Sequence, residues 1–449
     1  MKKAILLLIT VMILVACGVE GNTTSVADDT SSVREAAAGE PTLASAEATL
    51  TSEKATSTAS ATPAPFTAMA QPEATPTIVE PPTATATLAP TPTSAPHVNV
   101  EQAPYAPSNC SDKYPCNDDV AGWEARLRVP PGFEARYFAR VEGQPTSLAF
   151  GPDGLLYVAT QSGEIVTVDE TGQVAPFFSG LDTPTGLAFQ PGTDELYVSS
   201  RLVNENSGGE AQVGVIRDGE LSQVFGEIPC CYTFLHAANG IAFGPDGYGY
   251  VAVGARADHG EILPGNPGAG QPDELHPWEA AILRFSPDGS EVEAYAYGLR
   301  NSYDLTWDAS GRLFATDNAP DFGPPDELHL VQAGGQHGYP WYECDVCFAA
   351  PDDVSVIEPV HEFVPHGAAA GISAYVDERF PGYYNNLFAV LWSAFAGAQK
   401  VVRLSPGGTE ASDFATGFAA PIDVAVGPDG ALFVADYATG IVFRIDYMG

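Results

Sequence analysis

Lysine is almost absent from most of this chain, whereas acidic residues are plentiful. From residue 117 onward the sequence has thirteen arginines and a single lysine, Lys400, and the 449 residues together carry a formal net charge of -38. So large a negative charge, with a pI near 4.2, argues against nucleic acid or an anionic membrane surface as the partner. A bound anion would meet few basic side chains, so the position of each one is informative.

Two common structural signals are also missing. No Gly-x-Gly-x-x-Gly segment opens a helix, which argues against the phosphate cradle of a bound nicotinamide dinucleotide. No amphipathic helical pattern of any length stands out from the rest of the sequence. The lack of helical patterns favours a chain built mainly of strands.

Cysteine is sparse but has a pattern. Outside the first residues the cysteines are Cys110, Cys116, Cys230, Cys231, Cys344 and Cys347. An even number in an exported chain favours disulfides, and the local spacings suggest three short bridges, although six cysteines allow many connectivities. The Cys344/Cys347 pair could instead bind zinc, but no second CxxC or histidine pair has zinc spacing. The adjacent Cys230 and Cys231 could form a vicinal ring or bond elsewhere.

The chain begins with an export signal. In MKKAILLLITVMILVACG two lysines precede an apolar run that is too short for a membrane span and ends at a small residue, as in secretory signals. The end of this run, Leu14-Val15-Ala16-Cys17, resembles a bacterial lipobox, in which the cysteine is lipidated. We expect residues 1–17 to be a lipoprotein signal peptide and Cys17 to anchor the chain in the bacterial cell envelope, outside the cytoplasm. The alternative is a simple signal peptide that contains a cysteine.

Two regions of different composition follow. Residues 18–104 are rich in Ala, Thr, Ser and Pro, as in PPTATATLAPTPTSAP, and have almost no aromatic residues to bury. Such a segment cannot offset its ordering entropy, so we expect a disordered tether. Residues 105–449 are long enough for one large domain with a sizeable core.

This large domain contains six copies of one pattern: alternating apolar residues, a turn, and a second apolar strand. The copies cover residues 145–160, 184–200, 238–254, 301–317, 371–392 and 421–436. Alternation of period two predicts strands, and the recurring Gly-Pro-Asp-Gly or related turn predicts a tight reversal between them. Each copy is therefore expected to be a β-hairpin.

The spacing of the copies predicts the fold. Further strand-like segments follow several hairpins, and the copies recur at intervals that suit four-stranded blades with variable loops. Six units imply an all-β, six-bladed β-propeller. Residues 132–140 are expected to join the C-terminal strands in the last blade and so close the ring. The longest stretches between repeats, 201–237, 255–300 and 318–370, should wall a cleft at the central channel.

Three segments resemble a known family. HAANGIAFGPDG (236–247) is similar to the His-led segment of soluble pyrroloquinoline quinone (PQQ) sugar dehydrogenases, and residues 297–341 resemble their region from GxRN to GGxxGWP. Residues 421–445 look like the ending of the sorbosone dehydrogenase branch. The resemblance implies an extracytoplasmic, PQQ- and calcium-dependent enzyme that oxidises a sugar, aldose or polyol and passes electrons to a cytochrome or quinone pool.

The resemblance also implies roles for individual residues. His236 matches the general base, which takes the proton of a substrate hydroxyl as hydride leaves the same carbon. Arg300 and Asn301 match residues at the cofactor, where a guanidinium can stabilise negative charge on the reduced quinone.

Further matches lie after these. The backbone carbonyls of Ala319 and Pro320 match those that bind calcium in the family, and Asn318 matches a position that contacts the cofactor. His366 matches a pocket residue, and Lys400 lies near the position of a cofactor-binding cation in blade five. Asp326 and Glu327 could merely cap a turn.

The chain departs from the family at several positions. Ala419-Ala420-Pro421 stands where the sorbosone branch has Gly-Arg-Pro, LWSAFAGAQ (391–399) replaces a Gly-Ser-Trp-Asn-Arg type motif, and Leu181 replaces a glutamine. PQQ carries three carboxylates, and burying them without partners is unfavourable. Two other hypotheses therefore remain: a non-catalytic cell-surface propeller that binds glycan or protein, and a calcium-dependent lactonase-type hydrolase.

Overall fold

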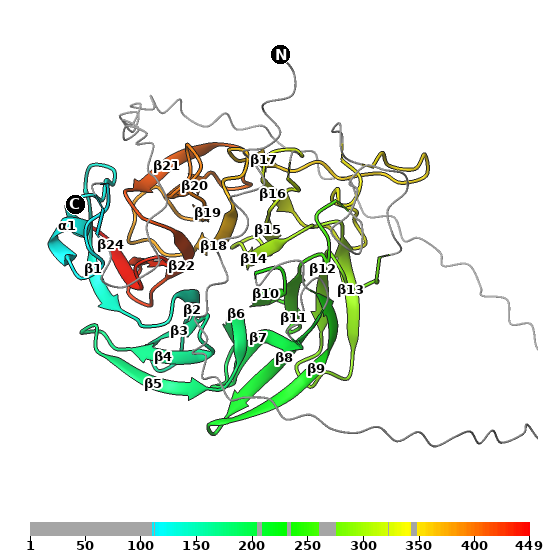
Figure 1. The fold of residues 1–449 in the computed structure, drawn as a ribbon, viewed down its shortest axis with the longest axis horizontal. Helices are drawn as coiled ribbons and strands as arrows, with labels where there is room; N and C mark the ends of the chain where they lie inside the picture. The colour runs from blue at the N-terminus through cyan, green and yellow to red at the C-terminus, as the bar shows by residue number, and fades with distance from the viewer. Residues whose placement is uncertain are drawn as a thin grey trace, which may run out of the picture. The chain divides into compact units, whose positions relative to one another are not determined.

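Six four-stranded antiparallel sheets form the blades of a closed β-propeller (Figure 1). The structure is a computed structural model and describes residues 110–111, 113–203, 209–230, 235–259, 275–321, 323–342 and 348–449. All of them belong to one compact unit, which spans Thr85–Gly449. The expected all-β, six-bladed propeller is confirmed.

The strands of each blade follow one another along the chain. Blade one consists of β2 (Pro145–Phe150), β3 (Leu156–Thr160), β4 (Glu164–Val168) and β5 (Val174–Ser179). Blade two consists of β6 (Asp182–Phe189), β7 (Leu196–Val203), β8 (Gly209–Arg217) and β9 (Glu220–Cys230). Blade three consists of β10 (Ala238–Phe243), β11 (Gly249–Val253), β12 (Ala281–Phe285) and β13 (Val292–Tyr297).

The remaining blades have the same order, except at the closure. Blade four consists of β14 (Ser302–Trp307), β15 (Leu313–Asp317), β16 (Glu327–Leu330) and β17 (His361–Glu362). Blade five consists of β18 (Ala369–Tyr375), β19 (Asn386–Leu391), β20 (Lys400–Leu404) and β21 (Ala411–Thr416). Blade six consists of β22 (Pro421–Val426), β23 (Leu432–Asp436), β24 (Ile441–Tyr447) and β1 (Phe133–Arg140).

The ring closes through the N-terminal strand of the propeller. β1 pairs antiparallel with β24, from Phe133 opposite Tyr447 to Arg140 opposite Ile441. The strand expected at residues 132–140 is therefore confirmed, and blade six combines both ends of the domain. This closure covers an edge that would otherwise be exposed to other chains.

The first strand of each blade lies innermost. β2, β6, β10, β14, β18 and β22 contact one another in sequence around the ring. The hairpin that starts each blade reverses at a tight turn; in blade one the amide of Gly154 donates to the carbonyl of Gly151 at 3.0 Å. Gly154 has a φ of +82°, a conformation that glycine adopts without strain. The Gly-Pro-Asp-Gly pattern therefore produces the turns expected of it.

Apolar side chains between the blades hold the ring together. Most residues of the inner strands are buried, and aromatic rings meet edge to face, as between Tyr197 of blade two and Phe243 of blade three at 5.0 Å between centroids. Such pairs stabilise sheet packing beyond the area that they bury. The helix α1 (Val120–Glu124) lies outside the ring; Asp119 caps it by accepting from the amide of Gly122. No helix among the described residues has the length and apolar character of a membrane span.

Several expectations concern cysteines and the N-terminal region. Cys110 and Cys116 form one short bridge, and Cys230 is also disulfide-bonded. Cys231, Cys344 and Cys347 lie outside the described residues. The signal peptide of residues 1–17 with Cys17 and the tether of residues 18–104 lie outside them as well, and these remain predictions.

Candidate active site

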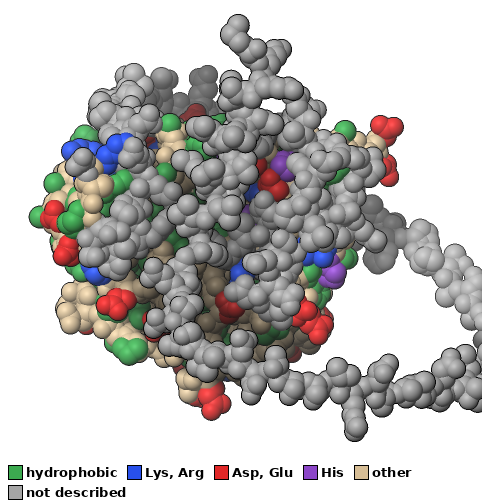
Figure 2. Space-filling model, viewed as in Figure 1, with side chains coloured by type: hydrophobic (Ala, Val, Ile, Leu, Met, Phe, Trp, Pro, Cys, Tyr) green, Lys and Arg blue, Asp and Glu red, His purple; other side chains and the backbone are tan. Residues whose placement is uncertain are grey.

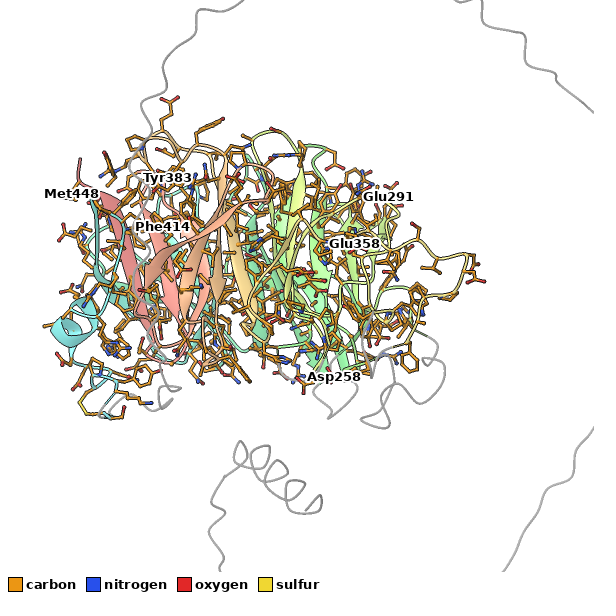
Figure 3. All side chains as sticks on the ribbon, turned by 90° about the horizontal axis from the view of Figure 1, so that it is seen from above. Asp258, Glu291, Glu358, Tyr383, Phe414 and Met448 are labelled. Carbon is orange, nitrogen blue, oxygen red and sulfur yellow. A yellow bond between two sulfur atoms is a disulfide. The ribbon has the colours of Figure 1, made fainter. Side chains whose placement is uncertain are left out.

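A cavity of about 440 Å³ lies at the inner ends of blades three to six. Its walls carry six of the residues that the sequence singled out: His236, Arg300, Asn301, Asn318, Ala319 and His366. These residues come from three separate parts of the chain, and the ring brings them together. Figure 3 shows the ring edge-on, with Asp258, which contacts Arg300, on the opposite face from Tyr383 and Glu291.

Arg300 is anchored by contacts on both sides. One terminal nitrogen, Nη2, lies 2.5 Å from Oδ1 of Asp258, and Nε donates to the carbonyl of Asp258 at 3.0 Å. The other, Nη1, donates to the carbonyls of Asn318 (2.9 Å) and Ala319 (3.0 Å). Burial alone would raise the pKa of Asp258, but a hydrogen bond from His259 and the charge of Arg300 lower it to about 2. The guanidinium is therefore held in one orientation and paired with an ionised carboxylate.

Two contacts of the His259 ring fix Asp258 and the loop beside it. Nδ1 of His259 lies 3.0 Å from Oδ2 of Asp258, and Nε2 lies 2.6 Å from the carbonyl of Asp321. The amide of Asp321 also approaches Asp258 at 3.3 Å. His259 thus joins the segment after β11 to the loop after β15, the two segments between which Arg300 lies.

The backbone before β14 is fixed by Asp317, the last residue of β15. Oδ2 of Asp317 accepts from the amide of Arg300 at 2.9 Å, and Oδ1 accepts from the amide of Asn301 at 2.7 Å. Asp317 is fully buried, and burial together with the nearby Glu327 raises its pKa well above the usual range. We call an aspartate that accepts from two successive amides in this way a clamp. The Asp317 clamp sets the direction of both residues that the sequence matched to a cofactor site.

His236 enters the cavity from the segment before β10. It is only 8% exposed, and burial together with the charge of Arg300 lowers its pKa well below the usual value. The imidazole is therefore neutral near pH 7, which a proton acceptor requires. Gly254 makes room for this arrangement, because a Cβ there would lie 3.0 Å from Cα of His236 and 2.7 Å from Oδ1 of Asn301.

The asparagines form a connected network. Asn301 accepts from Asn239 at 3.0 Å through its side-chain oxygen. Its carbonyl accepts from the side-chain amide of Asn318 at 3.0 Å, and the same amide donates to the carbonyl of Ala369 at 2.8 Å. The network therefore joins blades three, four and five behind the cavity wall.

His366 stands on a strained loop at the start of blade five. It has a φ of +55°, and Ala368 has a φ of +52°, a region that non-glycine residues rarely adopt. Oγ of Ser393 donates to the carbonyl of His366 at 2.5 Å, and the amide of Trp392 donates to the carbonyl of Ala368 at 2.9 Å. The segment after β19 thus holds the loop in a conformation that would otherwise relax.

Two sequence-based positions differ from expectation. Lys400 does not line this cavity; its Nζ lies 2.5 Å from Oδ1 of Asp413 on the neighbouring strand, and it borders a separate hollow lined by residues of blades four and five. A buried lysine needs a carboxylate partner, and the pairing of β20 with β21 supplies one away from the channel. Pro320 is buried and does not line the cavity either; its carbonyl accepts from the amide of Gly323.

A compact group of possible metal ligands lies behind the cavity. Ligand atoms of Asp317, Glu327 and His329 all fall within 4.8 Å of one another, and Nε2 of His329 lies 3.0 Å from Oε2 of Glu327. Burial and the charges of neighbouring carboxylates raise the pKa of Glu327 to about 8, whereas burial lowers the pKa of His329 to about 4. Carboxylate and imidazole groups gathered at one place can bind a divalent cation.

Sequence reasoning missed several residues of this site. Asp258 and His259 follow a strand in a loop of no recognised pattern, so nothing local marks them. Asp326 was expected only to cap a turn, but it lines the cavity and accepts from the amides of Ala319 (3.1 Å) and Ala368 (2.6 Å). Glu327 and His329 could have been found, because alternate residues of a strand lie on one face.

Comparisons with known proteins agree with this geometry. The sequence model of a family described as Glucose / Sorbosone dehydrogenase matches residues 143–444. A curated relative, an uncharacterized protein of Borreliella burgdorferi, is 25% identical over 284 residues, which cover 58% of this chain and 71% of the relative.

Solved structures show the same fold. A PQQ-bound aldose sugar dehydrogenase from Streptomyces coelicolor is 21% identical with a TM-score of 0.54, over 71% of this chain and 99% of that one. A soluble aldose sugar dehydrogenase from Escherichia coli in its apo form is 18% identical with a TM-score of 0.53, over 70% and 99%. At these identities the likeness establishes the shared fold.

Proposed function

Because the chain belongs to the glucose/sorbosone dehydrogenase family, we propose that it oxidises a hydroxyl group of a sugar, aldose or polyol. The family and the sugar dehydrogenases among the solved structures support an oxidoreductase that acts on a small sugar. The observation that carries the proposal is the meeting of His236 with Arg300 in one cavity. One group can take a proton there, and the other can stabilise negative charge.

His236 acts as the base in this proposal. Its Nδ1 is buried, and we assign proton transfer to the other ring nitrogen, Nε2. The neutral imidazole takes the hydroxyl proton of the substrate on Nε2 while hydride leaves the carbon that carries this hydroxyl. The carbon is thereby oxidised to a carbonyl, and the two electrons pass with the hydride to an acceptor bound beside Arg300.

PQQ is the acceptor to test first, because a solved relative is described as PQQ-bound. A bound quinone would supply a two-electron acceptor. Arg300 and Asn301 would face its reacting oxygens, and these two residues fit there, whereas the side-chain amide of Asn318 already donates to two backbone carbonyls. The fit does not extend to the three carboxylates of PQQ, since Arg300 is the only lysine or arginine among the described residues that line the cavity.

Calcium has two candidate locations in this proposal. The family position implies the carbonyls of Ala319 and Pro320, but the first accepts from Arg300 and the second from Gly323. The group of Asp317, Glu327 and His329 offers carboxylate oxygens instead, which calcium prefers. We place a structural cation at this group, where it would offset the raised pKa of the buried carboxylates.

The proposed setting is the outside of a membrane. Lipidation of Cys17 would anchor the chain in the bacterial cell envelope, and the tether of residues 18–104 would hold the propeller away from the membrane. Electrons would then pass to a cytochrome or to the quinone pool. Mass spectrometry of the membrane fraction checks this, because a diacylated Cys17 is expected at the N-terminus.

The reaction is tested by His236→Asn in the full-length chain. With calcium and an added quinone, wild-type protein should reduce a redox dye in the presence of sugars, and removal of the base should lower the rate by about 100-fold or more. His361→Asn is the matched control, because His361 lies in β17 outside the cavity. Equal rates in wild type and His236→Asn would rule out His236 as the base, and cleavage of lactones without a dye would favour a hydrolase.

A further inference from the structure

The cavity has two walls of different chemistry. Blades three and four contribute histidine, arginine, asparagine and aspartate side chains. Blades five and six contribute mainly apolar surface, from Ala368, Ala370, Trp392, Phe395 and Ile422. We infer that the wall from blades five and six accepts an uncharged ring, so that the cavity takes neutral ligands and discriminates against polyanions, PQQ included. This inference rests on the proposed function and deepens it by assigning the charge of the ligand.

The positions of the lysines and arginines support this inference. From residue 117 onward every lysine and arginine lies in a described part of the chain, because residues 204–208, 231–234, 260–274, 322 and 343–347 contain none. Only Arg300 of these basic residues lines the cavity. On the face seen in Figure 2 the largest blue group lies at the upper left edge. A ligand with three carboxylates would therefore meet one cation.

That one cation is already paired. Arg300 forms an ion pair with Asp258 at 2.5 Å, and the low pKa of Asp258 keeps this carboxylate charged. The cavity also contains Asp321 and Asp326. The described lining therefore offers a bound polyanion no net positive charge, and like charges at close range oppose binding.

The position where the family carries an arginine shows the same lack of charge. Ala420 is 2% exposed, and its amide donates to Oδ2 of Asp436 at 3.0 Å. Ile422, two residues later, also lines the cavity, as does Tyr303 of blade four. The replacement thus lies in a buried segment directly before the inner strand β22.

Phe395 gives the apolar wall an exposed aromatic surface at the rim. It is 61% exposed and still lines the cavity, and its ring centroid lies 5.5 Å from that of His366. Its amide donates to Oγ of Ser393 at 3.2 Å, and its carbonyl accepts from the amide of Ala398 at 3.1 Å. The ring is therefore presented on an ordered loop, which lowers the entropy lost when a ligand packs against it.

An uncharged ring with an apolar face suits these surroundings. Two sources share that chemistry: the pyranose ring of a neutral sugar, whose C–H groups form an apolar face, and an uncharged planar quinone. Both would gain from contact with Trp392 and Phe395. A sugar phosphate or a tricarboxylate would lose hydration without gaining a cation.

Binding titrations of the full-length chain with calcium present test the inference. The probes are PQQ, menadione, glucose and glucose 6-phosphate, followed by tryptophan fluorescence and calorimetry. We expect glucose or menadione to bind, and the two titrations separate the two sources. We expect glucose 6-phosphate to bind at least about tenfold more weakly than glucose, and PQQ not to saturate at tens of micromolar.

Two variants add a cation, one in the apolar wall and one in the segment directly before its strand β22. Ala420→Arg returns the arginine of the sorbosone branch, and Phe395→Arg adds one at the exposed rim, where folding is not at risk. Each should tighten PQQ binding by about tenfold or more. Val376→Arg is the matched control: Val376 is 53% exposed at the far end of β18, so it adds the same charge away from the cavity and should change nothing.

The outcomes separate this inference from the proposed function. Submicromolar, stoichiometric binding of PQQ to wild type would overturn the inference while strengthening the quinone-dependent reaction. A folded Phe395→Arg variant that binds PQQ no better than Val376→Arg would also overturn it. Weak PQQ binding with glucose oxidised through an added uncharged quinone supports the inference. Binding of glucose without any oxidation supports it too, but ends the dehydrogenase assignment.

Discussion

Blades four and six share one backbone arrangement, but blade four carries polar side chains where blade six carries apolar ones. In blade four residues 298–301 read Gly-Leu-Arg-Asn, and in blade six residues 417–420 read Gly-Phe-Ala-Ala. Both segments begin with a glycine at positive φ and run into the innermost strand. In both, an aspartate at the end of the second strand, Asp317 or Asp436, accepts from two successive amides.

The difference shows that the clamp and the chemistry are separable. The aspartate fixes the backbone in both blades, whichever side chains follow. In blade four the fixed backbone positions Arg300 and Asn301 at the cavity, and in blade six it positions two methyl groups. The repeat therefore provides equivalent positions around the channel, and the residues at those positions decide which blade contributes polar side chains to the cavity.

The first prediction makes blade four resemble blade six. Arg300→Ala should lower the rate of sugar oxidation by about 100-fold or more, because the group that stabilises developing negative charge is lost. It should also destabilise the fold by about 3–5 kcal/mol, because Asp258 is left buried without its partner. Dye reduction and thermal unfolding measure the two effects.

A double variant separates these two effects. Arg300→Ala with Asp258→Asn removes the unpaired charge, so most of the stability should return while the activity stays low. If the double variant recovers activity together with stability, Arg300 acts only as a structural partner of Asp258.

The second prediction compares the two clamps directly. Asp317→Asn and Asp436→Asn each replace an acceptor oxygen by a donor that faces backbone amides, and each should destabilise the propeller by roughly 2–3 kcal/mol. Only Asp317→Asn should also reduce oxidation, because it moves Arg300 and Asn301. Denaturant unfolding and dye reduction on both variants test this, and an equal loss of activity in both would contradict the separation of clamp from chemistry.

The fold could be predicted from the sequence because each repeat consists of alternating apolar residues and turn glycines. Each hairpin is a local structure, so its strands could be placed from residues within about twenty positions of one another. Closure by β1 also followed, since a propeller without it would leave an exposed edge. Nothing of this kind marks Asp258 or His259, whose role depends on loops that only the ring brings together.

The prediction for the site was less complete for the same reason. His236, Arg300, Asn301 and Asn318 lie directly before or after hairpin strands, so their direction is set by the repeat. Lys400 lies equally close to a strand, but it starts the third strand of its blade, which lies farther from the channel than the first. A linear match therefore placed Lys400 with the other site residues, but it does not line their cavity.

The third prediction concerns a pair that both blades do share. Asp304 in β14 and Asp423 in β22 occupy matching positions of the innermost strands; Asp423 is buried and Asp304 is half-buried. Burial raises the pKa of Asp304 to about 7, and burial together with the charge of Asp304 raises that of Asp423 well above its usual range. Each accepts from an amide of the next blade, Asp304 from Ile372 at 2.9 Å and Asp423 from Leu148 at 2.6 Å.

The sign of the pH dependence follows from these shifts. An aspartate in the unfolded chain ionises near pH 4, whereas the folded protein keeps Asp304 protonated until about pH 7. The stabilising contribution is therefore complete below about pH 4 and is lost as the pH rises through about 7. We expect an unfolding temperature that falls by a few degrees between pH 5 and pH 8.

Asp304→Asn isolates this contribution from the general repulsion of a chain with so many acidic groups. The amide is neutral at every pH and can still accept from Ile372, so the variant should show a smaller fall in unfolding temperature between pH 5 and pH 8. Asp288→Asn is the control, because hydrogen bonds from Ser290 and Ser286 lower the pKa of this exposed turn carboxylate to about 2. Its stabilising contribution is lost only as the pH falls through that value, so the control should keep the wild-type slope. If Asp304→Asn keeps the wild-type slope, titration of Asp304 does not contribute to the pH dependence of stability.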